Sequence, residues 1–205
     1  MQDYTSGPGF LGTELYSMMI PLVLIAVGAT WGASATAEEE DEGTADVLLT
    51  LPISRVRIII AKIAATVTAV TVLAFLAMAN VLVLRGVVDM KIDTGKLFAG
   101  SISSVAISLF FTGVAFLIGS MSRRKGTAVG AVTGLALITF LIYSLSGLVD
   151  DFDRVRPFNP MEWGLAGNPL FEGIDTAGTL KLALSALILL ALANYKFDHK
   201  DISTP

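Results

Sequence analysis

Apolar residues in this chain are gathered into long blocks separated by short polar stretches. Four blocks contain no charged residue and reach the roughly 20 helical residues that a bilayer core of about 30 Å requires. In lipid an isolated strand would leave its backbone groups unpaired, so each block is predicted to be a membrane-spanning helix. The four blocks are Ser17–Thr36, Ile63–Leu84, Leu97–Ser122 and Gly126–Val149.

A fifth apolar run, Leu182–Tyr195, is too short to span a bilayer alone. Extension back to Thr176 gives sufficient length but includes Lys181, whose ammonium group can reach the headgroups from a helix end. The sequence therefore predicts an all-α membrane protein with a single domain over residues 1–205. Its five spans are expected at about 17–36, 57–84, 97–122, 126–149 and 177–195.

Composition supports this class and excludes several others. Hydrophobic residues make up 54% and charged residues 16%, whereas soluble domains carry about 25% charged residues. The chain has no cysteine and one histidine, His199, so no thiolate or histidine metal site is expected. A net charge of −4 gives no reason to expect nucleic-acid binding.

Basic residues suggest how the five spans are oriented. The loops after the first and third spans and the C-terminal tail together hold eight Lys and Arg residues, against six in the N-terminal stretch and the other two loops. The positive-inside rule places the first set in the cytoplasm. No Lys or Arg precedes Arg55, so the first span lacks the basic region of a signal peptide.

Small residues recur at intervals of four in two predicted spans. Such residues let helix backbones approach closely, and hydroxyl groups can hydrogen-bond across the contact. Each face is therefore predicted to be a helix-packing surface, with a substrate pathway as the alternative and, for the third span only, a dimer seam. The residues are Ser104, Ser108 and Thr112 in the third span and Gly126, Gly130 and Gly134 in the fourth.

The four charge-free blocks contain no Asp, Glu, Arg or His. Ion-coupled transporters and voltage sensors usually keep such groups inside the membrane, which argues against an ion-coupled carrier. A phosphate-binding loop is also absent, because Gly95-Lys96 lacks the earlier glycine and the following Ser or Thr. We therefore expect no catalytic residue, no metal and no cofactor in this chain, and an energy source in a partner.

The connection between the first two spans, residues 38–55, has the most distinctive pattern. Glu38–Glu42 places five acidic residues at the C-terminal end of a helix, where the helix dipole disfavours anions. Gly43 is a natural helix stop. Thr44–Leu51 can then form a short amphipathic helix. Its apolar face is formed by Val47, Leu48 and Leu51.

Two further residues bound this short helix. Pro52 ends it, since the residue before proline avoids helical geometry, and Ser54 suits the N-cap of the second span. A short helix with one apolar face either sits in a groove on a partner or lies on the lipid surface. Anionic headgroups would repel the acidic run beside it, which favours the partner.

Residues 38–62 resemble the signature of type-2 ABC exporter permeases. In that family acidic residues are followed by Gly-Thr, a Leu pair, Pro-x-Ser-Arg and a later Gly-Lys; here Ala61 replaces the second glycine. The five spans agree with the family's last five in order and spacing, and Ser122–Lys125 resembles its second cytoplasmic contact. The matching residues are Gly43-Thr44, Leu48-Leu49, Pro52, Ser54-Arg55 and Lys62.

The resemblance implies a permease in a prokaryotic plasma membrane that works as a homo- or heterodimer. Residues 38–55 would then be a coupling segment that docks on a separate ATPase subunit, which binds ATP and magnesium. The family's first span has no counterpart before Ser17, so either a natural short form or a permease whose start is missing is expected. The implied ATPase contacts are Glu42, Gly43, Thr44, Val47, Leu48, Leu51, Pro52, Arg55, Arg123 and Arg124. A non-transport anchoring or assembly subunit is the alternative.

The loop over residues 150–175 is the longest polar connection and is expected outside the cell. Its Asp150-Asp151-x-Asp153 stretch lacks the glycine and terminal glutamate of a calcium loop. Trp163 and the apolar residues around it predict either short interfacial helices or a simple loop with an aromatic anchor.

Overall fold

The computed structural model describes residues 7–43, 54–87, 90, 92–146, 148–149, 152 and 154–200. Five of its helices are long and apolar enough to cross a membrane, and no strand occurs in this described part of the chain. The prediction of an all-α polytopic protein is confirmed. The five candidate spans are Leu11–Glu38, Arg55–Val87, Thr94–Met121, Lys125–Leu145 and Thr176–Asp198.

The first span begins earlier than the sequence predicted. α1 (Gly7–Phe10) continues through a π-helical stretch, η1 (Leu11–Met19), into α2 (Ile20–Asp41). The charge-free window excluded Glu14 and everything before it, yet Tyr16 in this stretch is only 2% exposed and belongs to the core. The expectation that the first span holds no ionisable residue is therefore wrong, because Glu14 lies within it.

The next two spans are bounded by the polar residues around them. α4 (Arg55–Val87) begins directly after Ser54, whose Oγ accepts a hydrogen bond from the Arg57 amide at 3.4 Å, as expected for an N-cap. α5 (Thr94–Met121) is capped by Asp93, whose carboxylate accepts from the Gly95 amide at 2.6 Å.

The last two spans depart from prediction mainly at their C-terminal ends, where α6 ends earlier and α9 ends later than predicted. α6 (Lys125–Leu145) stops before the predicted Val149, because Ser146 adopts an extended conformation. α9 (Thr176–Asp198) includes Lys181, as predicted. The Asp175 carboxylate caps it by accepting a hydrogen bond from the Ala177 amide at 3.0 Å.

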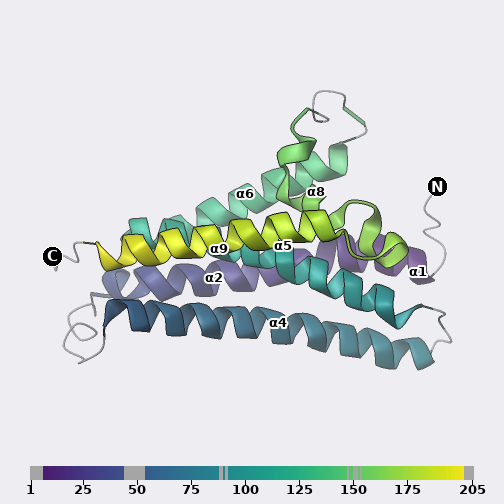
Figure 1. Cartoon of the computed structure of the whole chain (residues 1–205), viewed down its shortest axis with the longest axis horizontal. Coiled ribbons are helices and arrows are strands. Elements are labelled where there is room, and N and C mark those ends of the chain that lie inside the picture. The colour runs from purple at the N-terminus through teal and green to yellow at the C-terminus, as the bar shows by residue number, and fades with distance from the viewer. Residues whose placement is uncertain are drawn as a thin grey trace.

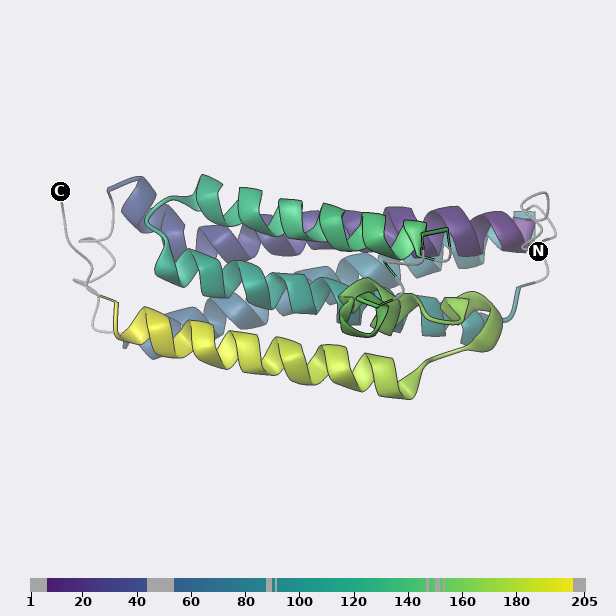
Figure 2. The same ribbon diagram turned by 90° about the horizontal axis from the view of Figure 1, so that it is seen from above.

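α5 is the central helix of the bundle. It packs most extensively against α2 and α9, with α4 and α6 also in contact, and Figure 2 shows α6 and α9 on opposite sides of it. α4, α6 and α9 leave most of their apolar surface open, as expected for helices that face lipid or another protein. α1 and the C-terminal end of α9 lie at opposite ends of the bundle (Figure 1), here named the α1 end and the α9 end.

The long connection between α6 and α9 forms short helices rather than a simple loop. They are η2 (Arg156–Phe158), α8 (Pro160–Leu165) and the π-helical η3 (Asn168–Glu172). α8 packs into the core, since Met161 and Leu165 are buried beside Leu182 of α9. The connection therefore closes the α1 end of the bundle between α5, α6 and α9 (Figure 1).

Candidate functional site

Five of the predicted ATPase-contact residues are brought to the α9 end (Figure 1). Glu42 and Gly43 follow α2 and are exposed, and Arg55 opens α4. Arg123 and Arg124 are exposed in the turn between α5 and α6. The predicted contacts Thr44, Val47, Leu48, Leu51 and Pro52 lie outside the described residues.

Gly43 ends α2 as the sequence predicted. Its φ of +70° lies in the left-handed region, which side chains with a Cβ rarely adopt. A Cβ at Gly43 would meet no atom within 4 Å, so the requirement for glycine comes from the backbone and not from space.

Two residues of the acidic run at the end of α2 are paired with cations inside this chain. Lys125 Nζ lies 2.7 Å from Glu38 Oε1, and the Lys125 amide donates to Asp41 Oδ2 at 3.2 Å. Lys200 Nζ lies 2.7 Å from Glu40 Oε2. These lysines offset the unfavourable position of anions at a helix C-terminus. Lys125 also joins the two loops that are expected to contact the ATPase.

The serine and threonine face of α5 packs inside the chain. Ser104, Ser108 and Thr112 are buried, and a Cβ on Gly28 of α2 would collide with the Thr112 hydroxyl. The Thr112 hydroxyl donates to Ser108 O at 2.8 Å, within its own helix and not across the contact. Ser108 and Thr112 of this face therefore pack against α2 within the chain.

The glycine face of α6 differs from that of α5 despite the same spacing. A Cβ built on Gly126, Gly130 or Gly134 would meet no atom within 4 Å. No described helix of this chain packs closely at these three glycines. The face is open to lipid or to another protein.

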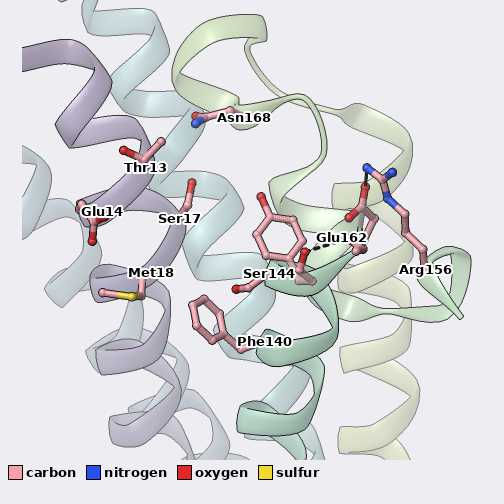
Figure 3. A pocket seen from close by; sticks show the side chains of 11 residues that line it. Thr13, Glu14, Ser17, Met18, Phe140, Ser144, Arg156, Glu162 and Asn168 are labelled. Carbon is pink, nitrogen blue, oxygen red and sulfur yellow. Dashed lines mark hydrogen bonds and ion pairs between the residues drawn. The ribbon is translucent and has the colours of Figure 1, made fainter. Parts of the chain in front are cut away.

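A second polar region lies at the α1 end, where a cavity of about 440 Å³ opens between the first span, α6 and the α8 region. Thr13 and Ser17 of the first span lie opposite Phe140 and Ser144 of α6 (Figure 3). The remaining lining residues are Glu14, Met18, Tyr143, Ser146, Arg156, Glu162 and Asn168.

One ion pair stands at the rim of this cavity. Arg156 Nη2 lies 2.6 Å from Glu162 Oε1 (Figure 3), and the other carboxylate oxygen of Glu162 is buried without a hydrogen-bond partner. Sequence reasoning missed this region because the charge-free window removed Glu14. Among the described residues no group of three or more His, Cys, Asp or Glu could hold a metal. Asp150, Asp151 and Asp153 lie outside them.

Five apolar helices, four of them packed around α5, with ion pairs at the helix ends, define a polytopic helical membrane protein. A family model described as ABC-2 family transporter protein matches residues 3–202. The chain therefore belongs to this family and is a membrane permease of an ABC transporter, which confirms the resemblance found in residues 38–62. No curated protein matches it.

Proposed function

We propose that this permease is the membrane subunit of an ATP-driven exporter and docks a separate ATPase subunit through residues 44–52. The observation that carries the proposal is the grouping of Glu42, Gly43 and Arg55 beside the Arg123-Arg124 turn at one end of the bundle. These residues flank the docking segment on both sides. The turn that carries Arg123 and Arg124 adjoins the first flank, because the Lys125 amide donates a hydrogen bond to Asp41.

The division of labour follows from the chemistry available. The ATPase binds ATP and magnesium and hydrolyses the nucleotide, while the permease provides the route through the membrane. The apolar face of residues 44–51, with Leu48 at its centre, is buried in a groove of the ATPase. Helix-in-groove docking of this kind is held by a few buried apolar anchors.

A second permease copy or a related permease completes the membrane part. We place it on α6, where Gly126, Gly130 and Gly134 leave room for a close helix approach. The exposed side chains of Leu137 and Leu141 continue this face toward the α1 end.

Co-purification of the ATPase with permease variants tests the docking proposal. Leu48→Ala removes an anchor and should cost roughly 2–5 kcal/mol if it behaves like a buried core leucine. Leu48→Asp should cost more, because it adds an unpaired buried carboxylate. Arg55→Ala should cost least, since an exposed ion pair contributes about 0–1 kcal/mol.

The matched control is Leu148→Asp, the same substitution at a leucine that is 79% exposed and lies beyond α6, toward the α1 end. It should leave ATPase association unchanged. Normal membrane insertion of each variant is checked by its yield and elution profile. Retention of the ATPase by Leu48→Asp at the level of the parent would show that residues 44–51 lie on lipid.

A further inference from the structure

Lys200 follows α9 and contacts the ends of three other helices. Its Nζ lies 2.7 Å from Glu40 Oε2 in the last turn of α2. The same Nζ donates to the carbonyl oxygen of Ser122, just after α5, at 2.7 Å. The Lys200 carbonyl in turn accepts a hydrogen bond from Arg55 Nη1, at the start of α4, at 2.9 Å. One residue therefore links α2, α4, α5 and α9 at the α9 end.

The charges in this cluster are shielded from water. The Lys200 and Glu40 side chains are only 12% and 10% exposed, against 33% and 38% for the Lys125–Glu38 pair. Removal of either partner would leave an uncompensated charge in a poorly hydrated place, so the pair resists opening.

An apolar layer directly beneath fixes the position of Lys200. Phe197, one turn earlier on α9, is 4% exposed and packs with Ala193 against residues of the other three helices. These are Ala35 of α2, Ile59 of α4 and Phe116 of α5. The same four helices are thus held by an apolar layer and by the polar contacts of Lys200 above it, so Lys200 cannot swing away without disturbing both.

The contacts of Lys200 fall on both flanks of the docking segment. Glu40 lies just before residues 44–52 and Arg55 just after them, while Ser122 opens the turn that carries Arg123 and Arg124. We infer that Lys200 is a positioning residue, which holds the two flanks at a fixed spacing and against the α5–α6 turn. Its effect on the ATPase rests on the proposed function, whereas the fixed spacing does not.

Sequence order alone gives no link between α9 and the docking segment. Lys200 instead connects α9 to both flanks of the segment. A displacement of the docked segment by the ATPase would therefore be passed to α9 and to the central helix α5 together.

The fixed spacing can be measured in the permease alone. The chain has no cysteine, so spin labels can be placed at Glu42→Cys and Arg57→Cys, two exposed positions on opposite flanks. Lys200→Met should broaden the distance distribution between the labels. Lys200→Arg keeps the positive charge and should retain the narrow distribution. The matched control is Lys196→Met, at an exposed lysine one turn earlier on α9, which should leave it unchanged.

ATPase association with the unlabelled variants gives the second readout. Lys200→Met should weaken it roughly tenfold, equivalent to about 1.4 kcal/mol, while Lys200→Arg and Lys196→Met should not. A distribution for Lys200→Met that matches the parent would overturn the inference. A broadened distribution with unchanged ATPase affinity would overturn its role in docking.

Two further outcomes are separable. Failure of the parent to bind an ATPase would contradict the proposed function, while the distance measurement would still decide the role of Lys200. Where Lys200→Met does not accumulate in the membrane, Glu40→Gln is tested instead. It removes the negative charge that pairs with Lys200 while the side chain keeps nearly the same volume. An unchanged distance distribution in that variant would also overturn the inference.

Discussion

The hydroxyl of Thr112 on α5 lies directly against Gly28 of α2, in the space that a β-carbon at that position would occupy. The contact repeats one turn along, where a Cβ on Gly32 would approach Ala115 and Phe116 to 3.1 Å. Close approach of these backbones lets α5 bury most of its surface in the centre of the bundle.

Leucine substitutions at two glycines should therefore have different effects. Gly28→Leu forces α2 from α5 and should lower the stability of the monomer by at least about 1–3 kcal/mol, the usual cost of overpacking. A Cβ at Gly130 has no described atom within 4 Å, so Gly130→Leu should leave monomer stability unchanged while weakening association of two permeases. Thermal unfolding in detergent measures the first effect, and chemical cross-linking in membranes measures the second. Equal destabilisation by both would contradict the assignment of the α6 face.

The ion pair between Lys125 and Glu38 should contribute little to stability. Both side chains are about one third exposed, at 33% and 38%, and pairs of this kind contribute about 0–1 kcal/mol. Lys125→Met should therefore lower the free energy of unfolding by no more than about 1 kcal/mol. Loss of one partner from the buried Lys200–Glu40 pair can cost about 3–5 kcal/mol. Chemical unfolding of Lys125→Met and Lys200→Met compares the two losses of stability. A larger loss for Lys125→Met than for Lys200→Met would contradict this prediction.

The orientation in the membrane can be tested with two single cysteines. Phe158→Cys, at a residue that is 78% exposed near the α1 end, should react with an impermeant reagent added outside the cell. Arg123→Cys, exposed in the α5–α6 turn, should react only after the membrane is permeabilised. The basic bias of the loops gives this direction. The opposite labelling pattern would refute both the topology and the docking of an ATPase at the α9 end.

The purified permease should hydrolyse no ATP, because the chain contains no phosphate-binding loop. Phosphate release is measured with the permease alone and after addition of the co-purifying ATPase. Hydrolysis by the permease alone that survives removal of contaminating ATPases would contradict the assignment of the chain as a non-enzymatic subunit.

The sequence predicted the positions of the helices better than it predicted which helices pack against one another. Charge-free length identified four spans, and extension past Lys181 gave the fifth. Gly43 and Ser54 marked the two flanks of the docking segment. The same window excluded Glu14, because it treats a single carboxylate at a span end as a boundary. The spacing of the small residues also could not distinguish the serine and threonine face of α5 from the glycine face of α6. A run of small residues shows that a helix can be approached, but not which helix approaches it.

The polar contacts at the α9 end were beyond sequence reasoning for a different reason. Arg55 and Lys200 are 145 residues apart and meet only because α4 and α9 run to the same end of the bundle. One signal was present: five acidic residues at a helix C-terminus need cations nearby. It did not indicate which of the fourteen Lys and Arg residues would supply them.

Site-specific photo-cross-linking in native membranes tests the central claim most directly. A photoreactive residue at position 48, in place of Leu48, should form a covalent adduct with a protein that carries a phosphate-binding loop. The same residue in place of Leu148 should form none with that protein. Cross-linking of position 48 to lipid alone, with the ATPase present in the same membranes, would contradict docking through residues 44–52.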